Sequence, residues 1–496
     1  MRINDKDLNH YYASLSEIYK LEGINALLYW DQKTYMPPKA AQHRASQLAL
    51  VDQLIHQRKT SPELQHKVQD LLQCEGLKPE DRINLQRTNY EITRNQKLSE
   101  EFVATRSRLQ AECYSLWIEA RPSSSFKSVA PHLEKLVELA RQEADLTGYS
   151  EHPYDALLEV YEPFSRLSKI KPVLLELGGG LRQLIDQIPA KGQDLSSAKE
   201  EDYLAENQHQ LNLAIASDLG FESDEGRLDV TAHPFASDMG PYDYRITTRY
   251  DETDFLSAVF STLHETGHAL YEMGLPKEYL GSACGRAISL GIHESQSRFW
   301  ENCVGRSKPY ARYLHRLLGR YLPEAAENFS EEQLYRAANK VQPSLIRVEA
   351  DEVTYSLHVV IRMLLEEQLI SGNLAVSELP DAWNDQYKNH LGLDVPADCD
   401  GVLQDVHWYT GSFGYFPTYA FGNIYGAMMH RKMRSDIPEM DSLIENGEFA
   451  QILSWLRERV HKFGTRFEAA ELASRASGMP VSSQPFLDYL REKHLG

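Results

Sequence analysis

Helical periodicity runs along most of this 496-residue sequence and restricts its fold more than any other feature. Segments such as Ser46–Gln57 and Val129–Leu146 place apolar residues three and four positions apart between Glu, Gln, Arg and Lys. This pattern predicts amphipathic helices, each with one buried face. Between Leu8 and about Leu146, prolines predict the connections between these helices; they are Pro37, Pro38, Pro62, Pro79, Pro122 and Pro131. We therefore expect a mainly α fold.

Two segments interrupt the helical pattern. Arg227–Val230 and Tyr244–Tyr250 carry β-branched and aromatic residues, with a Gly240-Pro241 turn signal between them. We expect them to pair as a short antiparallel sheet. Gly178–Gly180 lies within an otherwise helical stretch, where three glycines cost about 3 kcal/mol of helix propensity relative to alanine. We expect a break or a close backbone approach there, and we favour a simple turn between two helices.

Amino-acid composition and net charge limit the class of protein and the kinds of binding partner that we expect. Hydrophobic residues make up 42% of the chain and charged residues 25%, as in an ordinary globular protein. The 52 Lys and Arg against 72 Asp and Glu give a net charge of −20. This argues against nucleic acid and anionic membranes as partners, because both bind basic surfaces. We find no internal repeat and no biased linker, so we expect one helical body, with a division into two lobes left open.

The cysteines and the apolar segments indicate where the protein works. The five cysteines are scattered and form no C-x-x-C pair, which is typical of free thiols in a reducing compartment. The first residues are polar, so we expect no secretory signal. No run of 18 apolar residues occurs, so we expect no membrane span. Together these features predict a soluble cytoplasmic protein.

The strongest chemical signal is the motif His264-Glu265-Thr266-Gly267-His268, which lies inside a predicted helix. Asp254 is a suitable N-cap, and Gly274 followed by Pro276 ends the helical pattern. The four-residue spacing puts His264 and His268 on one face, so both imidazoles can reach a single metal ion. Glu265 then lies beside that face, where it can take a proton from a bound water.

A third metal ligand has to come from another segment. The metzincin pattern is absent, because Tyr271 and Gly274 occupy the positions of its glycine and third histidine. Glu294 lies 26 residues after His268, which leaves room for a loop and a second helix that passes the first. Two histidines, one carboxylate and a water form the open coordination of a catalytic zinc site. His293 competes for this role, but we favour Glu294 and assign His293 to the surroundings of the site.

Several further residues are candidates on weaker grounds. Arg347 lies on a predicted amphipathic helix, where it either pairs with Asp351 or presents its fork to a carboxylate ligand, and spacing alone favours the pair. Arg245 either contacts substrate or bridges to Asp243. His407 and nearby tyrosine hydroxyls can donate hydrogen bonds to an oxyanion. A packed aromatic core is the alternative for each of these tyrosines, which include Tyr409, Tyr415 and Tyr419.

Together, the motifs resemble one family. In order, they are His233-Pro234-Phe235, Asp243-x-Arg245-x-Thr247, His264-Glu265-x-x-His268, His293-Glu294-Ser295-Gln296, Ile346-Arg347-x-x-Ala350-Asp351 and Gly401-x-x-Gln404-Asp405-x-His407-Trp408. The likeness extends to Tyr29–Pro37 and Glu151–Leu158, and so covers almost the whole chain. The sequence thus resembles the carboxypeptidase Taq family of thermostable-type zinc metallocarboxypeptidases.

The resemblance implies a single catalytic domain over residues 1–496, with a deep groove and a fold similar to neurolysin-like (gluzincin) peptidases. It also implies a homodimer, one Zn²⁺ per chain with Co²⁺ as an effective substitute, and removal of C-terminal residues from peptides with broad specificity. Transferred to this chain, the roles are as follows: metal ligands His264, His268 and Glu294; general base Glu265; oxyanion and subsite groups His407 and Tyr419; substrate contacts Arg347, Arg245 and, more weakly, Tyr415.

Two other functions remain open at this stage. The same metal face can serve an oligopeptidase or an aminopeptidase, because a metal-activated water hydrolyses several kinds of bond. A helical binding protein with a vestigial metal site is the alternative outside enzymes. The intact set of His264, Glu265, His268 and Glu294 speaks against the second alternative.

Overall fold

The computed structural model describes residues 4–188 and 203–496. Nearly all of the regular structure in these ranges is helical, with one small three-stranded sheet, which confirms the mainly α prediction. None of the described helices combines the length and the apolar character that crossing a bilayer would require.

The helices before the sheet follow the sequence signals closely. Ser61 and Ser99 accept backbone N–H bonds in the first turns of α3 and α5, as N-caps do. Pro131, expected at a connection, lies instead in the second turn of α6, where it removes one hydrogen bond near the helix start. The bounds are α1 (Asp5–Lys33), α2 (Ala41–Lys59), α3 (Pro62–Leu72), α4 (Pro79–Gln96), α5 (Glu100–Ala120), α6 (Phe126–Thr147), α7 (Pro153–Leu158), α8 (Leu167–Gln187) and α9 (Ala205–Asp218).

The sheet is mixed, and one part of its prediction was wrong. Its order is β1 (Gly226–Val230), β3 (Tyr244–Thr248), β2 (Ala236–Asp238). β1 pairs with β3 in parallel, with Gly226 opposite Tyr244, whereas β2 pairs with β3 antiparallel. The Gly240-Pro241 turn therefore closes a hairpin between β2 and β3, not between β1 and β3. β2 was not predicted, because a segment of three residues is too short to show a strand pattern.

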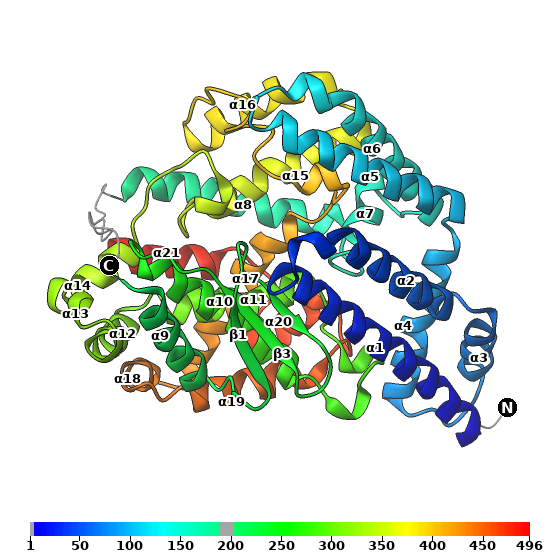
Figure 1. Cartoon of the computed structure of the whole chain (residues 1–496), viewed down its shortest axis with the longest axis horizontal. Helices are drawn as coiled ribbons and strands as arrows, with labels where there is room; N and C mark the ends of the chain where they lie inside the picture. Colours follow the sequence, from blue (N-terminus) through cyan, green and yellow to red (C-terminus); the bar gives the residue numbers. More distant parts are fainter. Residues whose placement is uncertain (1–3, 189–202) are drawn as a thin grey trace.

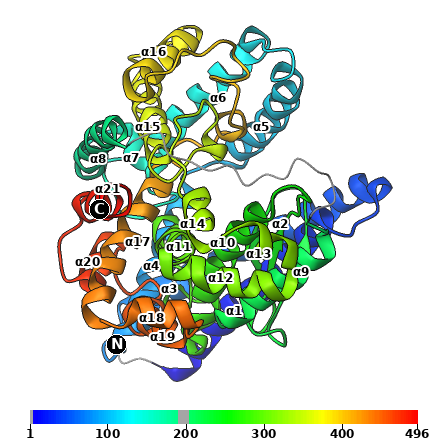
Figure 2. The same cartoon turned by 90° about the vertical axis from the view of Figure 1, so that its left-hand side faces the viewer.

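After the sheet, the chain forms the helices that surround the centre of the molecule. They are α10 (Phe255–Gly274), α11 (Leu290–Arg298), α12 (Lys308–Tyr321), α13 (Pro323–Asn328), α14 (Glu331–Ala338), α15 (Tyr355–Ser371), α16 (Leu379–Leu391), α17 (Pro417–Asp436), α18 (Met440–Asn446), α19 (Ala450–Arg459), α20 (Ala469–Ser477) and α21 (Gln484–Leu495). In Figure 1, α10, α11 and α17 lie at the middle, between α12–α14 on one side and α1–α4 on the other. In Figure 2, α5, α6, α15 and α16 lie together above α10–α13.

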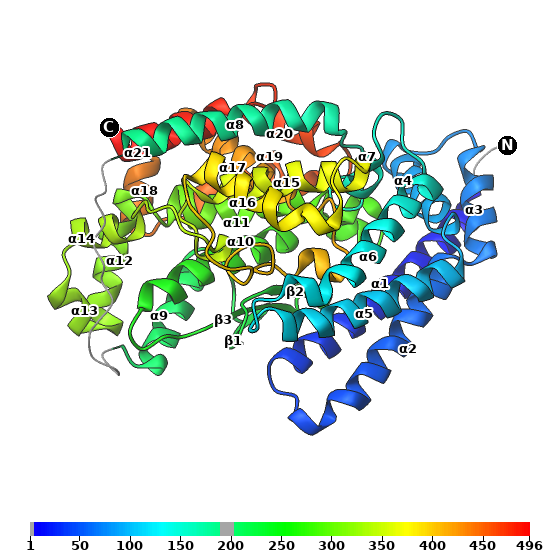
Figure 3. The same cartoon turned by 90° about the horizontal axis from the view of Figure 1, so that it is seen from above.

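The glycine triplet Gly178–Gly180 does not break its helix, so the expected turn was wrong. α8 continues from Leu167 to Gln187 and runs beside α21 (Figures 1 and 3). A Cβ on Gly180 would come within 2.4 Å of Leu487 Cδ1 on α21. The close approach that the sequence left as the second explanation is therefore the one observed.

Buried apolar side chains form two clusters. The larger cluster includes residues of helices from α5 to α21 and of β1 and β3. The smaller one joins α1, α3 and α4 around Tyr11 and Val68, and these helices lie together at one end of the molecule in Figure 3. α10 and α11 belong to the larger cluster, so a well-packed core fixes both helices.

A groove of about 1020 Å³ opens beside the first turns of α10. Its walls include Phe260 of α10, Arg298 at the end of α11, Glu301, and Tyr355 at the start of α15. This groove reaches Arg298, Glu301 and Tyr355, which surround the histidine motif, but none of the predicted metal ligands lines it.

Candidate active site

The histidine motif lies in the middle of α10. Asp254 caps this helix, since its side chain accepts hydrogen bonds from the backbone N–H groups of Leu256 and Ser257, as predicted. His264 and His268 lie one turn apart on the same face, with ring centroids 4.8 Å apart. Both imidazoles are partly exposed, whereas Glu265 between them is buried.

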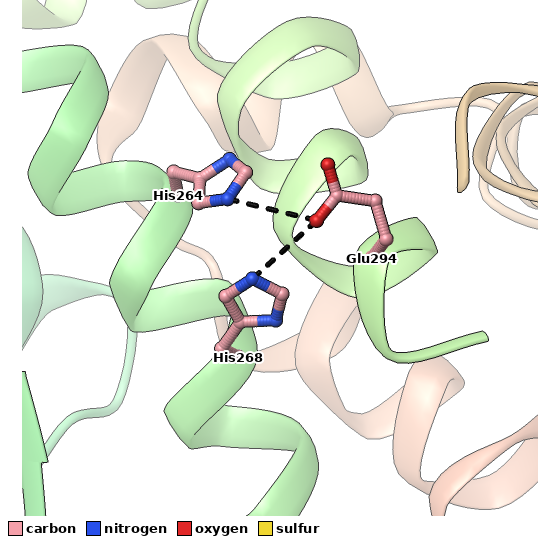
Figure 4. A group of neighbouring side chains, drawn as sticks. All are labelled: His264, His268 and Glu294. Carbon is pink, nitrogen blue, oxygen red and sulfur yellow. Dashed lines mark ion pairs between the residues drawn. The ribbon is translucent and has the colours of Figure 1, made fainter. Parts of the chain in front are cut away.

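Glu294 reaches this face from α11, a helix capped by Ser289. Its Oε2 lies 3.7 Å from Nε2 of His264 and 3.5 Å from Nε2 of His268, and Figure 4 shows all three side chains pointing toward one another. Zinc ligands bound at 2.0–2.1 Å with tetrahedral angles lie about 3.4 Å apart. The donor atoms of the three residues therefore fit a zinc ion, and they form the one such group in the part of the chain that the structure describes.

Close packing of α17 against α11 fixes the position of Glu294. A Cβ on Gly422 of α17 would come within 2.3 Å of Glu294 Cγ, so the two helices meet closely only because this residue is glycine. Arg298, one turn after Glu294, donates a 2.7 Å hydrogen bond to Glu294 Oε1. One carboxylate oxygen is thus held by arginine, and the other faces the histidines.

Glu265 has the properties of a proton-transfer group. Burial raises the pKa of its carboxyl to about 7, with a further upward contribution from the charges of Glu294 and Glu301 and a downward one from His264. A carboxyl with a pKa near the working pH exchanges protons most effectively. A cation between the histidines would lower this pKa, because it favours the carboxylate form.

Glu301, in the π-helical segment Phe299–Val304, holds His264 in place. Its Oε2 lies 2.9 Å from His264 Nδ1. Arg298 and Arg306 both donate to the Glu301 carboxylate, at 3.2 and 3.0 Å, and with His264 they hold its pKa well below the usual range despite burial. The carboxylate is therefore charged and ready to accept a hydrogen bond from the imidazole.

Arg347 lies on a 3₁₀ turn, Arg347–Glu349, and not on the α-helix that was expected. Its ion partner is Asp405 at 2.7 Å, and not Asp351, whose carboxylate instead accepts the N–H groups of Val353 and Thr354. Asp405 comes from a distant segment, so spacing along the sequence gave no sign of this pair.

The pair between Arg347 and Asp405 is part of a buried cluster. Arg362 also binds Asp405, at 2.6 Å, and Arg347 Nη1 donates to the hydroxyl of Tyr355 at 2.9 Å. Two guanidinium groups thus share one carboxylate, which leaves a net positive charge. That charge favours an anionic ligand nearby.

His407 and two tyrosines line the side of the site next to this cluster. The Tyr419 hydroxyl lies 3.4 Å from His407 Nε2, and the Tyr415 and Tyr419 rings are 5.2 Å apart. Burial lowers the pKa of His407 to about 4, so the ring is neutral at pH 7. Burial raises the pKa of both tyrosines, with an added contribution from the charge of Glu294. Their hydroxyls therefore keep their protons and can donate.

Arg245 lies on β3 and is engaged in a local interaction. Its guanidinium forms two hydrogen bonds with Asp243, at 2.8 and 2.9 Å, and lies 4.2 Å from the ring centroid of Trp30. The bridge to Asp243 that the sequence left open is thus present. Within residues 4–188 and 203–496, no hydrogen bond of its side chain goes to another predicted site residue.

Comparison with known proteins agrees with this geometry. Residues 10–494 match the family model described as carboxypeptidase Taq (M32) metallopeptidase. The chain belongs to this family. Thermostable carboxypeptidase 1 of Thermus thermophilus is 40% identical over 494 residues, which is 96% of this chain and 95% of that protein. Carboxypeptidase 1 of Bacillus subtilis is 36% identical over 471 residues, covering 95% and 94%.

Solved structures of the carboxypeptidase Taq family have the same fold. The M32 carboxypeptidase of Deinococcus radiodurans superimposes with a TM-score of 0.95 at 36% identity and covers 99% of both chains. The Pyrococcus furiosus carboxypeptidase gives 0.95 at 33% identity over 100% of both chains. The resemblance inferred from the motifs is confirmed: the chain is a metallocarboxypeptidase, a peptide hydrolase, and neither alternative function is favoured.

In this carboxypeptidase Taq member, several residues that contact the site or its surroundings were not predicted from the sequence. Arg298 lies four residues after Glu294, and Glu272 lies four residues after His268, so helical spacing could have indicated both. Glu301 follows Glu294 by seven residues, which again places it on the same helix face. Tyr355 and Asp405 gave no comparable signal, because only tertiary packing brings them to Arg347.

Proposed function

We propose that the chain removes C-terminal residues from peptides with broad specificity, using one zinc ion held by His264, His268 and Glu294, with cobalt as an effective substitute. The convergence of these three donors beside the buried Glu265 carries the proposal. When bound, the metal acts as a Lewis acid that polarises the scissile carbonyl and lowers the pKa of a water molecule.

The residues of the chain then move the protons. Glu265 takes a proton from the attacking water and passes it to the leaving amine, a role that its buried position next to His264 on α10 supports. His407 and Tyr419 donate hydrogen bonds to the oxyanion that develops on the carbonyl. The 3.4 Å separation of the two groups, the neutral ring of His407 at pH 7 and the protonated hydroxyl of Tyr419 support this role.

Specificity for a free C-terminus requires a cation that recognises the α-carboxylate. We assign this role to Arg347, because its cluster with Arg362 and Asp405 keeps one positive charge in excess. Arg245 is a second substrate-side candidate, and would have to exchange its bond to Asp243 for one to the peptide. Tyr415 is a weaker candidate for a subsite contact beside Tyr419.

A single pair of peptides tests the proposal. Zinc-loaded protein should shorten a free-acid peptide stepwise from its C-terminus, and chelator should abolish this. The same peptide with an amidated C-terminus should be cleaved far more slowly, because it offers no carboxylate to the arginine. Equal rates on the two peptides would rule out the carboxylate requirement, and internal or N-terminal cleavage would indicate an oligopeptidase or an aminopeptidase.

We also infer the setting in which the enzyme works: one catalytic unit over residues 1–496, a homodimer, in the cytoplasm. The continuous larger core supports a single unit. Five free cysteines, four of them buried, support a reducing compartment. Sedimentation of the purified protein would test the dimer.

A further inference from the structure

The two histidines of the metal site are supported in different ways. His264 contacts a carboxylate directly, since its Nδ1 lies 2.9 Å from Glu301 Oε2. His268 meets the carboxylate of Glu294 through Nε2, but no hydrogen bond among the described residues joins its Nδ1 to a carboxylate. This Nδ1 lies 2.6 Å from Nδ1 of His293, whose backbone also hydrogen-bonds the His268 ring. His293 Nε2 in turn lies 2.9 Å from Oε1 of Glu272. On its Nδ1 side, a second imidazole therefore separates His268 from the carboxylate of Glu272.

Hydrogen-bond chemistry fixes the direction of this chain. Nε2 of His268 faces Glu294 and must be unprotonated to bind a cation, so Nδ1 carries the proton. His268 Nδ1–H donates to Nδ1 of His293, which acts as acceptor. The other nitrogen of His293, Nε2, then carries a hydrogen and donates a hydrogen bond to the Glu272 carboxylate. This direction assigns one tautomer to each ring.

We propose that Glu272 is a positioning residue for the metal site and that it acts on His268 through His293. The proposal rests on the metal assignment made above. By fixing the tautomer of His293, the carboxylate keeps an acceptor in front of His268 Nδ1. This orients the His268 ring and increases the electron density at its Nε2. Glu301 thus orients His264 by direct contact, whereas Glu272 orients His268 indirectly, through the imidazole of His293.

The positions of the three residues suit this role. Glu272 follows His268 by one helical turn on α10, and His293 immediately precedes Glu294 on α11. The chain of hydrogen bonds therefore links both helices that supply metal ligands. The ring of Tyr271 packs edge-on against His293, with centroids 5.4 Å apart, and restricts the orientation of the imidazole.

A purely structural link between α10 and α11 is the competing explanation, and metal affinity separates the two. The side chain of Glu272 is 23% exposed, so replacements of similar length are needed to keep the space it fills. E272M removes the acceptor and keeps the length of the side chain, whereas E272Q keeps an acceptor oxygen without the charge. E278Q removes an exposed carboxylate just beyond the end of α10 and is the matched control.

The affinity of each metal-free protein for Zn²⁺ would be measured by competition with a chelator, and its Tm by thermal unfolding. We expect E272M to bind zinc ten- to a hundredfold more weakly, with the Tm of the metal-free protein close to that of the wild type. E272Q should retain most of the affinity, and E278Q all of it. H293F should lose as much as E272M, and combining the two should cost no more than H293F alone, because they break one chain of bonds.

Unchanged zinc affinity in E272M would overturn the proposal. Equal losses of zinc affinity in E272M and E272Q would also overturn it. The same holds if the fold-loss of affinity in the double variant equals the product of the fold-losses in E272M and H293F. A lower Tm with normal affinity would identify Glu272 as a structural link only. Failure of the wild-type protein to bind one zinc per chain would instead contradict the proposed function, and the E272 variants would not be needed to show it.

Discussion

Among single residues, Glu265 has the most specific predicted role, that of the general base. E265Q keeps the size of the side chain but cannot accept or deliver the proton. We expect it to lower kcat/KM by about 10²–10⁴-fold or more, as for the loss of a general base. The measurement is turnover of a free-acid peptide, with zinc content determined on the same sample. A variant that contains zinc and turns over at a near-native rate would contradict the assignment.

The positions of some site residues could be predicted from the sequence, and those of others could not. His264 and His268 were predicted to share a face because helical geometry fixes residues four apart, and the structure has them so. Glu294 was predicted from coordination chemistry and lies within 3.7 Å of both rings. Asp405 as the partner of Arg347 could not be predicted, because the two lie 58 residues apart in the sequence and meet only in the folded chain.

At the scale of elements, the contact of α11 with α17 determines where Glu294 lies. G422A adds a methyl group that would meet the Glu294 side chain at 2.3–2.8 Å. Since helix backbones yield little, we expect the variant to lose about 1–3 kcal/mol of stability and to displace the carboxylate. Thermal unfolding and chelator competition would show a lower Tm together with weaker zinc binding.

G179A is the control for this prediction. Gly179 lies inside α8, and a Cβ there would meet nothing within 4 Å. Alanine in place of glycine in a helix interior contributes about 0.5–1 kcal/mol of stability, so this variant should unfold at a slightly higher temperature and bind zinc normally. A G422A protein that behaves like G179A would show that α17 does not constrain Glu294.

Helices and strands could be predicted from the sequence where local signals, such as cap and stop residues, determine their bounds. α10 begins after Asp254 and ends at Gly274, as the cap and stop residues indicated. The triplet Gly178–Gly180 was misread because the propensity cost of glycine is local, whereas the gain from packing α8 on α21 is tertiary. The pairing of β1 was missed for a similar reason: strand partners depend on register across the sheet, not on the sequence of either strand.

For the molecule as a whole, buried carboxylates predict how stability changes with pH. Glu366 of α15 is fully buried and accepts hydrogen bonds from Tyr154 of α7, from Trp408 and from the backbone of Gly414, at 2.6, 2.7 and 3.1 Å. It thereby ties three distant parts of the chain together, including the segment with His407. Burial raises the pKa of Glu366 to about 7, partly offset by these donors and by Arg362.

The sign of the effect follows from the direction of this shift. In the unfolded chain, Glu366 has its ordinary pKa near 4.5. Between about pH 4.5 and pH 7, the Glu366 carboxyl therefore holds its proton more tightly in the folded protein than in the unfolded chain. The contribution of Glu366 is therefore complete below about pH 4.5 and is lost as the pH rises through about 7. A difference of about 2.5 pKa units corresponds to about 3 kcal/mol.

E366Q isolates this contribution, because glutamine has nearly the same shape and does not titrate. Chemical unfolding of metal-free wild-type and E366Q proteins at pH 5 and pH 8 gives the difference in their free energies of unfolding at each pH. The wild type should lose up to about 3 kcal/mol relative to E366Q over this interval. Groups common to both proteins cancel in the comparison, Glu162 with its raised pKa among them. Parallel pH profiles for the two proteins would mean that Glu366 titrates no differently when folded, and that its three donors hold the carboxylate in its charged form throughout.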